Sequence, residues 1–157
     1  MQLNVAQLLK SSIGTERNYR IDEDIEIESR KVRVVGEVKL IRTDRSILIK
    51  SALVAKIDIE CVRCLEIFQC PIEIKFEEEF FPTIEVLTGL PYEVPEEQQP
   101  GYFIIDENHI IDLDEAIRQY TILGIPMKPL CKEECAGLCP TCGKNINQGY
   151  CNCLTET

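Results

Sequence analysis

Near its C-terminus the chain reads Cys131-Lys-Glu-Glu-Cys135-Ala-Gly-Leu-Cys139-Pro-Thr-Cys142-Gly143, and Cys151-Asn-Cys153 follows shortly after. This stretch holds six thiols and almost no apolar side chains from which a core could form. A segment without a core needs another source of order, and thiolates gathered around a zinc ion supply one. The pattern therefore predicts a small, metal-ordered tail.

The spacing of the thiols favours Cys139 and Cys142 as ligands. The Cys-Pro-x-Cys-Gly motif at 139–143 is typical of a knuckle that directs two sulfurs at one ion. Its partners are either Cys151 and Cys153 or Cys131 and Cys135, because both spacings close a compact loop. Four thiolates leave no position for water, so we expect a structural zinc. The candidate ligands are Cys131, Cys135, Cys139, Cys142, Cys151 and Cys153.

The cellular compartment supports metal over disulfides. The chain has nine cysteines, an odd number that a complete set of disulfides cannot use. Residues 1–10 are too short and polar for a secretory signal, and no apolar run approaches the ~20 residues of a spanning helix. We therefore expect a cytoplasmic protein without a membrane contact, whose thiols stay reduced.

A second cysteine pair, Cys61-Val-Arg-Cys64, allows three interpretations. A redox dithiol would place Cys61 at a helix N-terminus, but the flanking sequence favours strands. Alternatively, both cysteines are small, half-buried residues at the end of a hairpin. In the third interpretation the last four tail cysteines take one zinc, and Cys131 and Cys135 join this pair around a second ion.

Upstream of the tail, the hydrophobic pattern predicts mostly strands. A short amphipathic helix is expected at 4–10. Alternation of apolar and polar residues with a period of two then predicts strands within 25–40, 47–59 and 67–81. The last two would form a long antiparallel hairpin with the Cys61–Cys64 pair at or near its turn.

The region before the tail is predicted to combine a loop, two short strands and a helix. Residues 82–101 hold four of the eight prolines, which is typical of an extended loop. Short strands are expected at 102–105 and 110–111. A capping box formed by Asp112 and Glu115 opens a helix that ends near Leu123.

The predicted fold class is α+β, with an antiparallel, barrel-like β-sheet, two helices and a small C-terminal zinc-binding tail. We place the α+β domain at residues 1–130 and the cysteine-rich tail at 131–157. A chain of 157 residues has room for one substantial core and a small appendage that needs outside help to fold.

Charge is distributed unevenly along the chain. The net charge is −10, yet residues 1–56 carry 11 Lys and Arg against 8 Asp and Glu. On strands, this basic excess would form a face that contacts RNA phosphates, or else a charged sheet edge that resists aggregation. Most of the basic excess lies between Arg30 and Lys56, where the chain has no aromatic residues for stacking, so base reading is not expected. The candidate RNA-binding residues are Arg30, Lys31, Arg33, Lys39, Arg42 and Arg45.

Nothing in the sequence predicts a catalytic centre or a small-molecule substrate. We find no glycine-rich phosphate loop, no Ser/His/Asp set and no zincin motif. His109, the only histidine, lies between Asn108 and Ile110 in a segment that indicates an exposed turn. The protein is therefore predicted not to be an enzyme.

Several motifs together resemble the YceD family. They are Cys61-x-Arg-Cys-Leu65, Ile111-Asp-Leu113, Ile125-Pro-Met127 and Cys135-x-Gly-Leu-Cys-Pro-x-Cys-Gly-x-Asn-Ile-Asn147 with the final Cys-x-Cys. The resemblance implies a role in the accumulation or processing of large-subunit ribosomal RNA, as known for bacteria and plastids, without established catalytic residues. It also implies that the six tail cysteines form the zinc-type tail found in part of the family.

We therefore expect a non-enzymatic, zinc-stabilised factor in large ribosomal subunit biogenesis that binds ribosomal RNA or a ribosomal protein. Two alternatives remain open. One is a thiol redox protein that uses Cys61 and Cys64. The other is a protein adaptor without RNA contact, in which the 82–101 loop or the acidic middle of the chain engages a basic ribosomal protein.

Overall fold

The computed structural model describes residues 1–93, 103–149 and 151–154. The chain divides into two compact units. The first comprises Met1–Ala55 and Glu73–Gly124, and the second comprises Lys56–Ile72 and Ile125–Thr157. The predicted tail thus shares its unit with the middle segment of the chain that carries Cys61 and Cys64.

Most described residues outside the tail lie in strands. In chain order the elements are β1 (Gln2–Asn4), α1 (Ala6–Leu9), β2 (Glu16–Ile27), β3 (Arg30–Arg42), β4 (Ile47–Glu60), β5 (Ile67–Ile74), β6 (Glu77–Pro82), β7 (Phe103–Ile105), β8 (Ile110–Asp112), α2 (Asp114–Gly124) and two 3₁₀ turns, Ile146–Gln148 and Asn152–Leu154.

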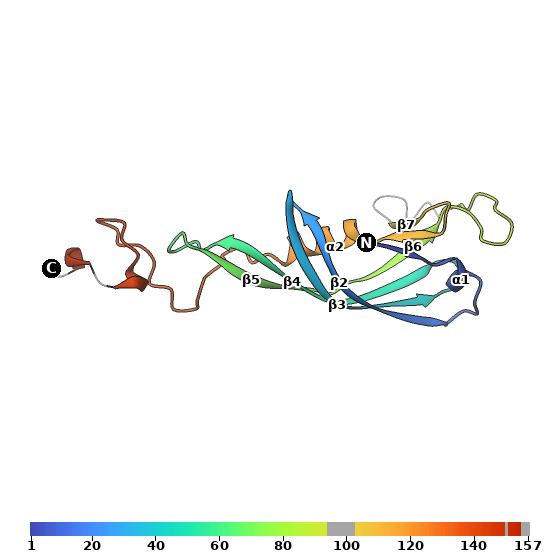
Figure 1. Ribbon diagram of the computed structural model, residues 1–157, viewed down its shortest axis with the longest axis horizontal. Coiled ribbons are helices and arrows are strands. Elements are labelled where there is room, and N and C mark those ends of the chain that lie inside the picture. Colours follow the sequence, from blue (N-terminus) through green and yellow to red (C-terminus); the bar gives the residue numbers. More distant parts are fainter. Residues whose placement is uncertain (94–102, 150, 155–157) are drawn as a thin grey trace. The chain divides into compact units, whose positions relative to one another are not determined.

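The strands form one curled, half-barrel sheet of eight strands within the described part of the chain (Figure 1). Its order is β1-β8-β7-β6-β4-β3-β2, and β5 pairs with β4 beside this path. The sheet is mostly antiparallel, as predicted, but β6 and β7 run parallel, so it is a mixed sheet. The prediction of an antiparallel, barrel-like sheet with two helices is therefore confirmed in part, because the sheet is curled but mixed.

The period-two pattern buries one face of the long strands. Val34, Val38 and Leu40 of β3 are buried, whereas the alternate residue Arg33 is exposed. The backbones of β3 and β4 approach closely at Gly36, where a Cβ would lie 2.2 Å from the carbonyl oxygen of Ala52. Only glycine fits there, so this residue permits the tight curl of the sheet.

The predicted strand 67–81 is interrupted. It forms β5 and β6, and β4 pairs first with β6 and then with β5. At the interruption the Ser51 amide donates to the carbonyl of Phe76 at 2.9 Å. The Phe76 amide in turn donates to the Ser51 hydroxyl at 3.0 Å. A side chain therefore replaces one partner of the backbone ladder at the point where the strand breaks.

Both predicted helices are present. The residues expected on the apolar side of α1, namely Val5, Leu8 and Leu9, are buried. The amide of Asp114 donates to the Asp112 carboxylate at 3.0 Å, which confirms the predicted start of α2. Helix α2 packs against β2. The ring of Tyr120, a residue of α2, stacks on the ring of Phe76 with 4.9 Å between the ring centroids.

Part of the predicted loop 82–101 can be described. Residue Pro82 ends β6, and a turn follows in which the Gly89 amide donates to the Glu85 carbonyl at 2.8 Å. An isolated antiparallel bridge joins Ile84 to Pro91. Residues 94–101 of the predicted loop lie outside the described residues.

Candidate metal centres

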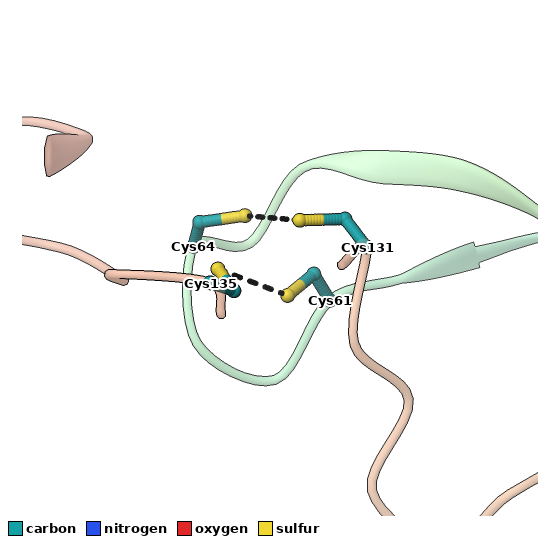
Figure 2. Close-up of side chains that lie close together, drawn as sticks. All are labelled: Cys61, Cys64, Cys131 and Cys135. Carbon is teal, nitrogen blue, oxygen red and sulfur yellow. Dashed lines mark hydrogen bonds between the residues drawn. The ribbon is translucent and has the colours of Figure 1, made fainter. Parts of the chain in front are cut away.

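The first cysteine cluster comprises Cys61, Cys64, Cys131 and Cys135. The turn between β4 and β5 supplies the first two, and the segment after α2 supplies the others (Figure 2). The Leu65 amide closes the turn by donating to the Cys61 carbonyl at 2.9 Å, with Leu65 in the left-handed region at φ 59°.

Both halves of the cluster belong to the second unit, and hydrogen bonds attach them to each other. The amide of Val62 donates to the carbonyl of Pro129 at 3.0 Å. The Arg63 guanidinium donates to the Cys135 carbonyl, also at 3.0 Å. These two bonds attach the hairpin turn to the downstream segment at Pro129 and at Cys135.

Sulfur spacing in this cluster fits one tetrahedral ion. The Sγ atoms of Cys61 and Cys135 lie 3.8 Å apart, and those of Cys64 and Cys131 lie 3.6 Å apart. All four sulfurs lie within 4.8 Å of one another. A disulfide needs about 2.0 Å. Metal–sulfur bonds of about 2.3 Å in a tetrahedron place the sulfurs about 3.8 Å apart.

Three of the four cysteines in the first cluster are buried, and Cys131 is half-buried. Cys61 is 0% exposed, and Cys64 and Cys135 are each 3% exposed. The apolar side chains that pack around the buried cysteines are Phe68, Leu130 and Leu138. Such a shell excludes water and strengthens the attraction between thiolates and a cation.

The four thiols of the first cluster cannot all ionise unaided. Burial raises the pKa of Cys61, but backbone N–H groups of Cys131, Cys64 and Arg63 outweigh it and lower this pKa to about 6. Burial and the neighbouring Cys64 side chain raise the pKa of Cys131 to about 12. A divalent cation would remove this conflict because it stabilises all four thiolates together.

The second cysteine cluster comprises Cys139, Cys142, Cys151 and Cys153, whose sulfurs also lie within 4.8 Å of one another. Its first two members sit on a tight knuckle. There the Cys139 amide donates to the Lys144 carbonyl at 2.8 Å, and the Gly143 amide donates to the Cys139 carbonyl at 2.9 Å. Gly143 has φ +71°, a conformation that favours glycine.

The second cluster is more open than the first. Cys142 and Cys153 are exposed, whereas Cys139 and Cys151 are buried. Backbone N–H groups of Cys142 and Thr141 lower the pKa of Cys139 to about 6. The neighbouring Cys142 side chain and burial raise the pKa of Cys153 to about 11. This donor set also needs a cation before all four sulfurs can be thiolates.

The six predicted tail ligands thus separate into two clusters. Of the three interpretations of the Cys61–Cys64 pair, the structure has the arrangement in which this pair meets Cys131 and Cys135. Cys61 and Cys64 are not among the six candidate ligands predicted for the tail. The only signal for them in the sequence is that one four-cysteine site in the tail leaves two tail thiols without partners. Cys61 lies in a hairpin turn, without the helix N-terminus that a thioredoxin-type dithiol requires.

Several of the predicted basic residues have acidic neighbours in the described structure. Strand β2 pairs with β3 along its whole length and brings acidic residues beside them. Arg33 forms an ion pair with Asp22 at 2.8 Å, and Lys39 forms one with Glu16 at 2.9 Å. The remaining candidates on β3 with exposed side chains are Arg30 and Lys31.

Two candidates near the end of β3 have local partners. The Arg42 guanidinium donates to the carbonyls of Leu9, Thr43 and Ser46 at 3.2, 2.7 and 3.1 Å. This pattern is typical of a structural arginine that satisfies loop carbonyls. Arg45 lies 3.6 Å from the carboxylate of the adjacent Asp44.

His109 lies in the β7–β8 turn, as predicted, but is half-buried where we expected exposure. Its backbone is left-handed at φ 58°, and its carbonyl accepts a hydrogen bond from the Val5 amide at 2.9 Å. The residue therefore connects the turn to the start of α1. None of the described helices is long and apolar enough to span a bilayer.

Comparison with known proteins places the chain in a family. Uncharacterized proteins of Mycobacterium bovis and Mycobacterium tuberculosis are 27% identical over 132 residues, which is 83% of this chain and 54% of each relative. One from Mycobacterium leprae is 25% identical over 113 residues, 70% of this chain and 48% of the relative.

The chain thus spans about half the length of the curated relatives it matches. No solved structure matches it. A family model described as large ribosomal RNA subunit accumulation protein YceD matches residues 49–157, which include both cysteine clusters. The chain therefore belongs to the YceD family.

Proposed function

We propose that the protein is a non-enzymatic factor in the accumulation of large-subunit ribosomal RNA, ordered at its C-terminus by two structural zinc ions. The observation that carries this proposal is the presence of two closed four-cysteine clusters in a chain of the YceD family. In each cluster four thiolates would fill a tetrahedral coordination sphere. No position is then left for a water nucleophile, so the expected role of the metal is structural.

The donor chemistry supports zinc. Four thiolates in a tetrahedron suit zinc or iron–sulfur centres. Sulfurs within 4.8 Å of one another enclose a single ion, whereas a cluster of several irons holds its cysteines farther apart. Zinc also suits the cytoplasm, where thiols stay reduced and where we propose that the protein acts.

Zinc would supply the order that the tail cannot generate alone. Cys64 and Cys131 are 67 positions apart in sequence, so an ion in the first cluster ties the hairpin turn to the tail. Small segments without a sufficient core commonly fold only with such a staple. We propose that residues 131–157 depend on metal in this way, whereas residues 1–130 contain the sheet and its apolar core.

The charge distribution supports a ribosomal protein as the direct partner more than ribosomal RNA. The chain carries a net charge of −10, which repels phosphates. The ion pairs of Arg33 and Lys39 offset the local basic excess of β3. Many ribosomal proteins are basic, and an acidic surface attracts them electrostatically.

The central experiment measures zinc and ribosomal RNA with the same variants. Zinc is determined by elemental analysis of reduced, purified protein, and the ratio of large- to small-subunit RNA is measured in cells whose only copy is the variant. We expect two zinc ions per chain, and Cys64→Ser and Cys139→Ser should each remove one and lower the ratio. Cys70→Ser is the matched control, because Cys70 lies on β5 outside both clusters.

Metal-free protein, or cluster variants that support a normal RNA ratio, would contradict the proposal. A second experiment separates the two partners. Ultraviolet crosslinking in cells reports direct RNA contact, and a salt-dependent pull-down after nuclease treatment reports a protein partner. If Lys31→Glu and Arg33→Glu abolish RNA crosslinks, the β3 face is an RNA contact and the protein-partner proposal is wrong.

A further inference from the structure

We propose that Asn147 couples the two cysteine clusters, so that metal in the second cluster raises the metal affinity of the first. This proposal rests on the proposed binding of a metal ion at both clusters. Asn147 would act as a positioning residue, because it contacts a ligand of one centre while it belongs to the loop that the other centre closes.

The contact reaches from one cluster to the other. The side-chain amide of Asn147 donates to the Sγ atom of Cys135 at 3.2 Å. Asn147 itself lies in the second cluster's own loop, between Cys142 and Cys151. The loop of the second centre therefore places an N–H group on a sulfur of the first.

Neighbouring groups fix which end of the Asn147 amide faces the sulfur. The carbonyl oxygen of its side chain accepts a hydrogen bond from the Ala136 amide at 2.9 Å. Its amino group donates to the side-chain oxygen of Asn145 at 2.8 Å, in addition to the sulfur. Because Ala136 can only donate there, the N–H end must point toward Cys135.

The loop that presents Asn147 is attached to the segment that follows Cys135. Its backbone is held by a bond from the Ile146 amide to the Gly137 carbonyl at 2.9 Å and by a single 3₁₀ turn, Ile146–Gln148. An isolated bridge pairs Leu138 with Asn145. Thiolates of the second cluster lie on both sides of this loop, so an ion there would fix the loop and hold the amide of Asn147 against the sulfur.

A hydrogen bond to a ligand sulfur favours its thiolate form. The Asn147 amide, 3.2 Å from the sulfur, therefore supports Cys135 as a metal ligand. Loss of an outer hydrogen bond to a metal ligand typically weakens metal affinity about 10- to 100-fold. Coupling of binding affinities is reciprocal, so metal in the first cluster must strengthen the second by the same factor.

The test measures the affinity of each cluster in the full-length chain. Cadmium is the probe, because ¹¹³Cd gives a separate NMR resonance for each four-thiolate centre, and chelator competition gives each affinity. Asn147→Ala should weaken the first cluster about 10- to 100-fold and shift its resonance. Asn147→Asp keeps an acceptor for Ala136 but places a carboxylate beside the sulfur, and should weaken the cluster further.

Gln148→Ala is the matched control. Gln148 lies in the same 3₁₀ turn and donates through its own amide to the Glu66 carboxylate of the hairpin, without contacting a sulfur. We expect the cadmium affinity of the first cluster in Gln148→Ala to stay within about twofold of that in the parent chain. A loss equal to that of Asn147→Ala would show that general loosening of the turn is responsible, and would overturn the proposal.

A double-mutant cycle tests the coupling itself. Replacing Cys139 and Cys142 by serine should disable the second cluster and weaken the first about as much as Asn147→Ala does, and the combined variant should lose no more. Fully additive losses would show that Asn147 acts independently of the second metal, and would overturn the coupling. Normal coupling with unchanged ribosomal RNA levels would instead contradict only the proposed cellular function.

Discussion

Gly36→Ala tests the close approach of β3 and β4 that permits the sheet to curl. Gly36 pairs with Leu53 and has φ +151°, which L-residues rarely adopt. An added Cβ would lie 2.2 Å from the Ala52 carbonyl oxygen and 2.8 Å from the Leu53 Cα. Both neighbours are backbone atoms of the partner strand, so the strands themselves must separate to relieve the contact.

The expected cost combines two effects. Backbone strain at positive φ costs about 1–2 kcal/mol. Overpacking against an unyielding neighbour adds about 1–3 kcal/mol. The sum of about 2–5 kcal/mol is a large fraction of the ~5–15 kcal/mol that stabilises a typical domain. We therefore expect Gly36→Ala to shift the unfolding midpoint strongly.

Gly14→Ala is the matched control, because Gly14 has φ +86° but nothing within 4 Å of the added Cβ. Gly14→Ala should lower the free energy of unfolding only by the backbone strain, about 1–2 kcal/mol. The assay is urea unfolding of the full chain at fixed zinc and protein concentration, followed by the strand signal in circular dichroism. Equal midpoint shifts in the two variants would refute the steric argument.

Three further predictions concern other parts of the molecule. A chromogenic chelator should remove zinc in two phases of one ion each, the faster from the second cluster, because Cys142 and Cys153 are exposed; a single phase would contradict this. The Glu78 carboxylate accepts a hydrogen bond from the Tyr120 hydroxyl, and this bond is the largest cause that raises the pKa of Tyr120 from 10.0 to about 12. The bond therefore stabilises the fold below pH 10, and this stabilisation is lost as the pH rises toward 12. Glu78→Gln should return that pKa toward 10 in an ultraviolet titration, and an unchanged value would exclude the contact. Arg42→Lys should cost about 1–3 kcal/mol in urea unfolding, because a lysine cannot reach three carbonyls at once, whereas a pure phosphate contact would leave stability unchanged.

Local patterns predicted most of the elements. The alternation of buried and exposed residues predicted β3 and β4, and the capping box predicted the start of α2. Both signals depend only on neighbours in sequence, and therefore survive without knowledge of the fold. The same holds for the knuckle at Cys139 and Cys142, whose two thiols are close together in the chain.

Features that depend on distant partners were missed or left open. Ser51 interrupts the predicted 67–81 strand through bonds to Phe76, a pairing that no local pattern indicates. No local pattern indicates that the acidic strand β2 lies beside the basic residues around Arg33. Likewise, the partnership of Cys61 with Cys135 spans 74 positions.

The two cysteine clusters also differ in when they can assemble during translation. All four cysteines of the second cluster lie within residues 139–153, whereas the first cluster can form only when residues 131 and 135 join Cys61 and Cys64. At about 5–20 residues per second, Cys64 is synthesised several seconds before its partner 67 positions later. The nascent chain therefore carries two unpartnered cluster thiols for that time, and the hairpin turn acquires its final form only after residues 131 and 135 have been made.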